Sequence, residues 1–144
     1  MAVTMSLYNH TVKLAANKEL TLTTLKVKLL DNTASFVAAD AAVTTVDAAG
    51  TKEVSGNGWA SGGPTLASVA VTTVTTNDAM LDADDVSVTA SGGSIGPAYA
   101  ALVYDATSNK PLIYIDFGQV QAAGDTTDFK IVWDATGLIK WSYT

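Results

Sequence analysis

The sequence predicts an all-β fold, an antiparallel sandwich of about seven or eight short strands in a jelly-roll-like arrangement. Two observations support this prediction. Apolar runs about one strand long alternate with turn-forming Gly, Asn, Asp and Pro residues along most of the chain, the pattern of antiparallel sandwiches. One hairpin, residues 97–117, is apolar on both faces, which is typical of strands covered on both sides in the middle of a sandwich.

The central hairpin consists of two apolar runs separated by a polar break. Residues 99–104 and 112–115 are rich in aromatic and β-branched side chains and are too short for helices. The break, residues 105–110, contains Asp, Ser and Asn, which hydrogen-bond their own backbone in turns. Pro111 suits the first residue of a returning strand.

The N-terminal part of the chain is expected to differ from the rest. Residues 1–19 are predicted to form either a short helix capped by Ser6 or an arm that docks on a neighbour, and residues 20–144 a single β-sandwich domain. Leu25, Val27 and Leu29 alternate with two lysines. This alternation predicts a strand with one buried face and one solvent-exposed face that carries Lys26 and Lys28.

The middle of the chain is predicted to be a long connection followed by a shaped loop. Asp40 is a candidate cap for one helical turn over residues 41–45. Residues 53–65 are dense in glycine, and glycine permits backbone angles that other residues avoid. The later strands are expected within the ranges 66–74, 80–88, 129–133 and 138–143.

Charge and length exclude several classes of function. The net charge is −6 and all eight basic residues are lysines. Arginine is the preferred residue for phosphate and guanine contacts, so nucleic acid is not an expected partner. There is neither a recognisable secretory signal nor a run approaching the roughly 20 apolar residues of a membrane span. Charged residues are only 15% of the chain, and such a surface is easily desolvated against another protein, as in an assembly subunit.

No catalytic constellation is expected, and hence no enzyme activity. Residues 92–96, GGSIG, match the nucleophile-elbow pattern formally, but a proline and a strand-like run follow where that motif needs a helix. We interpret this segment as a turn. Asp105 and Asp116 would form a glycosidase-type carboxylate pair only if they lay close on one face. Turn or strand-end roles are the favoured interpretation.

No metal or cofactor site is expected either. Asp82, Asp84 and Asp85 resemble the start of a calcium loop, but the chain returns at once to a strand pattern without the further ligands. We interpret the three as a solvated strand end, with a weak calcium site as the alternative. His10 is the only histidine and there is no cysteine, so these residue types do not supply a zinc site.

The candidate partner contacts are Trp59 and Asn57 in the glycine-dense loop and Leu7 and Tyr8 near the N-terminus. Trp59 is the one tryptophan expected to be exposed. Trp133 and Trp141 lie in strand-like runs and are expected in the core. A sugar-stacking platform of aromatic side chains is the alternative role for the exposed tryptophan.

Five segments of the chain resemble, in the right order, a family of small tailed-bacteriophage virion proteins. The matching segments are residues 25–30, LKVKLL; 53–63, EVSGNGWASGG; 81–86, LDADDV; 111–118, PLIYIDFG; and 129–139, FKIVWDATGLI. Residues 35–51 depart from the family, because alanines replace its usual acidic and aromatic residues.

The resemblance implies a non-enzymatic structural protein of the virion. It implies a head-decoration or cement protein with a jelly-roll-like sandwich, on the capsid exterior of a particle assembled in the host cytoplasm. Its expected partners are the major capsid protein and copies of itself, so a homo-oligomer is expected. A tail or appendage component, or a carbohydrate- or receptor-binding sandwich on the particle, is the alternative.

Overall fold

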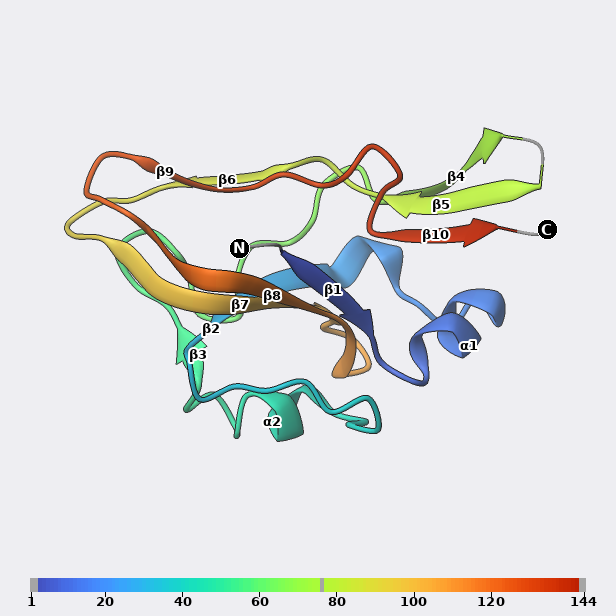
Figure 1. The fold of residues 1–144 in the computed structure, drawn as a ribbon, viewed down its shortest axis with the longest axis horizontal. Helices are drawn as coiled ribbons and strands as arrows, with labels where there is room; N and C mark the ends of the chain where they lie inside the picture. The colour runs from blue at the N-terminus through green and yellow to red at the C-terminus, as the bar shows by residue number, and fades with distance from the viewer. Residues whose placement is uncertain (1–2, 76, 143–144) are drawn as a thin grey trace.

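The computed structural model describes residues 3–75 and 77–142 and shows an all-β protein (Figure 1). The described residues form ten strands and three short helices. The strands are β1 (Thr4–Leu7), β2 (Leu25–Leu30), β3 (Glu53–Val54), β4 (Ala70–Thr75), β5 (Asp78–Asp82), β6 (Val86–Thr89), β7 (Ile95–Asp105), β8 (Lys110–Ala123), β9 (Asp128–Ile131) and β10 (Ile139–Ser142). The helices are α1 (Thr11–Ala16), α2 (Val43–Val46) and the 3₁₀ turn Leu22–Thr24. The antiparallel sandwich predicted from the sequence is confirmed.

The predicted hairpin lies at the centre of the largest sheet. Strands β7 and β8 pair antiparallel within a five-stranded sheet of order β1-β8-β7-β2-β3. The halves of both strands next to the connecting turn, residues 100–105 and 111–115, are buried, because other parts of the chain cover both faces of this sheet. In this sheet Val103 on β7 pairs with Ile113 on β8 and with Val27 on β2.

A second layer covers one face of this sheet (Figure 1). It consists of the two-stranded sheet β6-β9, which lies over the five-stranded sheet, and the three-stranded sheet β10-β5-β4, which extends beyond it on the side of α1 (Figure 1). The main hydrophobic core lies between the layers and includes Leu25, Val27, Val103, Ile113 and Ile115. The strands divide into sheets of five, three and two, so the two-sheet jelly-roll arrangement is not confirmed.

The opposite face of the five-stranded sheet is covered by residues 31–52, which include α2 (Figure 1). A second core lies under this segment and contains Tyr8, Leu30, Leu102 and Tyr114. Phe36 packs edge-on against Tyr8, with ring centroids 5.0 Å apart.

Three local predictions need correction. The N-terminal segment holds strand β1, paired with β8, as well as helix α1, whose first turn follows His10 rather than Ser6. The helical turn α2 forms, but Asp40 does not cap it, because its N-cap residue is Ala42. Lys28 was expected on the solvent-exposed face of β2, but it is buried, because residues 31–52 fold over that face.

Candidate functional site

The candidate site is an open edge of the sandwich where β1 and β9 lie. Strand β1 has β8 as its hydrogen-bonded neighbour and β9 has β6; within the described residues, the other side of each strand has no paired strand. A groove of about 340 Å³ lies at this edge. Its lining includes Val3, Met5, Phe117, Phe129, Lys130, Ile131, Val132, Trp133 and Asp134.

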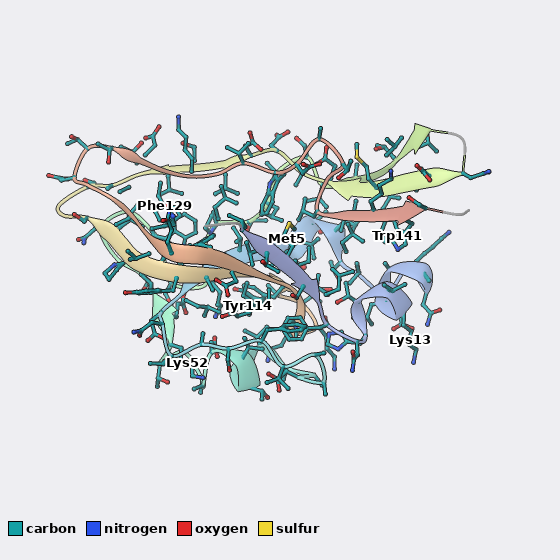
Figure 2. The ribbon with its side chains drawn as sticks, viewed as in Figure 1. Met5, Lys13, Lys52, Tyr114, Phe129 and Trp141 are labelled. Atoms are coloured by element: carbon teal, nitrogen blue, oxygen red, sulfur yellow. The ribbon has the colours of Figure 1, made fainter. Side chains whose placement is uncertain are left out.

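The groove exists because the second layer ends before it covers β1. Met5 pairs with Ile115 on β8 and so shares the core-facing side of the sheet. Figure 2 shows the Met5 side chain on the side of β1 that faces the second layer. Met5 is nevertheless 41% exposed and Val3 is 60% exposed. Val132, directly after β9, is 70% exposed. The edge therefore leaves large aliphatic side chains in water.

The rim of the groove carries two carboxylates and one ammonium group. Lys130 Nζ lies 3.6 Å from Asp128 Oδ2. A hydrogen bond from Thr89 is the main cause that lowers the pKa of Asp128, with a smaller contribution from Lys130. The backbone N–H and hydroxyl of Thr136 lower the pKa of Asp134. Both carboxylates are therefore ionised at neutral pH, and no cation pairs with Asp134 among the described residues.

Two of the four predicted contact residues are buried. Trp59 is 1% exposed and packs edge-on against Phe129, with ring centroids 5.4 Å apart. The expectation of an exposed Trp59 is therefore wrong: the glycine-dense loop folds its one large side chain into the main core. Tyr8 is also buried, beneath residues 31–52, and burial followed by the charge of Asp40 raises its pKa. Neither side chain is available on the surface of this chain.

The other two contact residues are accessible. Leu7 is 38% exposed and lies two residues beyond Met5 on β1, hence on the same side of the strand. Asn57 is exposed and donates from Nδ2 to the Ser94 carbonyl oxygen at 2.7 Å. The structure does not bring Asn57 into the lining of the groove.

The two carboxylates considered for glycosidase chemistry lie far apart. Asp116 pairs with Ala100, five residues before Asp105 on β7, a separation of roughly 17 Å along the strand. Asp105 is fully buried and accepts hydrogen bonds from Thr21, Thr24, Thr107 and Ser108. Asp116 is exposed and accepts from the Gly118 N–H. They do not form a catalytic pair.

Two of the three clustered aspartates have separate hydrogen-bond partners. Asp84 accepts from the Ser68 hydroxyl and Asp85 from the Trp133 backbone N–H. Residues 92–94 bend into β7, which begins at Ile95. No helix follows the serine, as the sequence predicted, but the predicted turn ends before its last two residues. In the part of the chain that the structure describes, no cluster of three or more His, Cys, Asp or Glu residues is arranged to hold a metal ion. His10 contacts the Pro111 carbonyl oxygen through Nε2 at 2.6 Å.

Trp133 and Trp141 are half-buried against the main core. The expectation that both tryptophans lie in the core is thus met only in part. Trp133 lines the groove and donates from its indole nitrogen to the Asp84 carbonyl oxygen at 3.0 Å. The groove itself was not predicted, although the alternation of Val3, Met5 and Leu7 with Thr4 and Ser6 is a strand signal.

Comparison with known proteins identifies no relative: no family model, curated protein or solved structure matches the chain. Among the described residues, no helix has the length and hydrophobicity needed to span a membrane.

Proposed function

We propose that this chain is a non-enzymatic structural protein of a bacteriophage virion, a capsid decoration or cement protein on the outside of the shell. It binds across neighbouring subunits of the major capsid protein, and homo-oligomeric contacts between its own copies add to this binding. The particle is assembled in the host cytoplasm. The sequence resemblance motivates this proposal, and the observation that carries it is the open β1–β9 edge.

The open edge supports binding to another protein because it leaves aliphatic side chains uncovered. Val3, Met5, Leu7 and Val132 are all at least one-third exposed. Burial of such side chains against a partner is favourable by about 25 cal/mol per Å² of apolar surface, before the cost of association. A protein that binds the assembled shell but not its dissociated subunits stabilises the shell by mass action.

The carbohydrate-binding alternative has less support in the structure. It relied on Trp59 as an exposed stacking surface, and Trp59 is buried. A position in the tail would use the same open edge, so the test must distinguish shell from tail.

The experiment mixes the purified full chain with shells assembled from the major capsid protein encoded in the same genome. We expect the chain to co-sediment with assembled shells at saturable stoichiometry, and to raise the temperature at which they dissociate. Unassembled capsid protein and isolated tails are the controls. Absence of binding to shells, or equal binding to unassembled capsid protein, would overturn the proposal.

A further inference from the structure

We propose that the groove between β1 and β9 is an acceptor site for an extended segment of a partner protein. The segment pairs with the free edge of β9, places aliphatic side chains at alternate positions over β1, and carries at least one Lys or Arg. Only the source of the segment, a neighbouring subunit of the particle, rests on the proposed function.

The backbone of β9 provides the first argument. It spans four residues and pairs with β6; no other strand pairs with it in the described part of the chain. The free side of such a strand presents unpaired N–H and C=O groups, which form a template for one more strand. Addition of a strand to an exposed sheet edge is a recurring mode of peptide recognition, in which the backbone gives affinity and alternate side chains give specificity.

The side chains below this edge provide the second argument. A strand added to β9 would extend the second layer over β1, where Val3 and Met5 lie in the groove lining. Because alternate side chains of a strand point to one face, every second residue of the segment would reach these two. Strand β1, Thr-Met-Ser-Leu, has neither a charged residue nor proline. The part of the groove that β1 contributes is therefore uncharged, which suits the aliphatic side chains of the segment.

The charge of the groove rim favours a partner segment that carries a basic side chain. The rim holds Asp128, Asp134 and Lys130, and the whole chain has a net charge of −6 without arginine. A basic side chain opposite an aspartate stabilises a cross-strand pair, whereas an acidic one opposes it. A second copy of this chain is a poor donor. Two of its segments place lysine between aliphatic residues. Leu25–Leu30 is already paired on both sides in the central sheet, and the other, Val12-Lys13-Leu14, lies in helix α1.

The test uses a random eight-residue peptide library displayed against the immobilised full chain. We expect enrichment of sequences with aliphatic residues at every second position and at least one Lys or Arg. The most enriched peptide is then synthesised in three forms: unchanged, with its basic residues replaced by Glu, and with alternate backbone nitrogens methylated. Both altered peptides should bind at least tenfold more weakly.

Two matched variants locate the binding. Val132→Lys removes an aliphatic side chain from the groove and adds a charge that repels the peptide, so the affinity should fall at least tenfold. Val71→Lys makes the same change at a residue of β4 that is 55% exposed and outside the groove lining, and should change the affinity less than twofold. Circular dichroism checks that both variants are folded. Enrichment of acidic or non-alternating sequences, no enrichment, or equal affinity in both variants would overturn the proposal.

The same variants separate this inference from the proposed function. If the wild-type chain fails to bind shells but the peptide results hold, the proposed function fails and the acceptor site stands. If the wild-type chain and Val132→Lys bind shells equally well, the groove does not receive the shell subunit and the inference about its source fails.

Discussion

Lys28 Nζ lies 2.7 Å from Asp47 Oδ2, a buried ion pair that joins strand β2 to the segment covering the sheet. Glu53 Oε2 lies 3.4 Å from the same nitrogen, and the Tyr104 ring lies 5.1 Å away. Burial lowers the pKa of Lys28, but the hydrogen bond to Asp47 and the charges of Glu53 and Asp47 outweigh it, so the net pKa is raised. This cluster holds residues 31–52 against the sheet.

Replacing Lys28 with Met should destabilise the protein by about 3–5 kcal/mol, because it leaves two carboxylates buried without a cation. Chemical denaturation measures the free energy of unfolding. Lys26→Met, two residues along the same strand, is the matched control and should cost less than about 1 kcal/mol, because Lys26 is only half-buried. Equal losses in the two variants would show that the buried cluster has no special role.

Replacing Asp105 with Ala should cost about 3 kcal/mol, because a buried carboxylate that accepts four hydrogen bonds is lost. Asp116→Ala removes an exposed carboxylate with one backbone donor and should cost less than about 1 kcal/mol. Thermal unfolding of both variants compares the two sites. A larger loss for Asp116 would contradict the structural role assigned to Asp105.

Replacing Gly63 with Ala should destabilise the protein by more than about 2 kcal/mol. Gly63 has a φ of +72°, and an added Cβ would overlap the Val27 carbonyl oxygen on β2. Gly50→Ala is the control, since Gly50 has a φ of +89° but open space around its Cα. Its cost should be near the ~1 kcal/mol of backbone strain alone. Equal losses of stability in Gly63→Ala and Gly50→Ala would contradict the close approach of the glycine-dense loop to β2.

The protein should lose stability in alkali. Burial is the main cause that raises the pKa values of Tyr8, Tyr104 and Tyr114 above the usual 10.0, and the pKa of Lys28 is also raised. Each group binds its proton more tightly in the folded chain than in the unfolded one. Their contribution is therefore fully present below the unfolded pKa values and is lost as the pH rises through the folded ones.

Ultraviolet titration of tyrosinate, together with unfolding measurements at each pH, checks this prediction. We expect these tyrosines to ionise only above pH 10.0, as unfolding sets in. Tyr8→Phe should reduce the loss of stability in alkali. Full ionisation of all tyrosines around their ordinary pKa, with the fold intact, would contradict the burial assigned to them.

The sequence predicts the strands well where local pattern and burial agree. The hairpin of β7 and β8 is an example, because its apolar runs and polar turn define it locally. The alternation in β2 predicts the buried Leu25, Val27 and Leu29. It fails for Lys28, because the covering segment that buries this residue contacts it through Asp47, nineteen residues away.

The candidate site was harder to predict because it depends on how strands meet in space. A tryptophan in a glycine-dense loop suggests exposure, yet Trp59 lies in the core because the loop folds back over the β6–β7 turn. The open edge arises because β1 joins β8. Leu7 pairs with Ile113, 106 residues away in the sequence, and local periodicity does not reveal such a contact.

Electron cryomicroscopy of purified virions tests the central claim most directly, because it gives both the position and the orientation of each copy. The account predicts many copies on the icosahedral shell, each with its β1–β9 edge against a neighbouring capsid subunit and an extended segment of that subunit beside β9. A few copies confined to the tail, or shell-bound copies with this edge facing solvent, would contradict it.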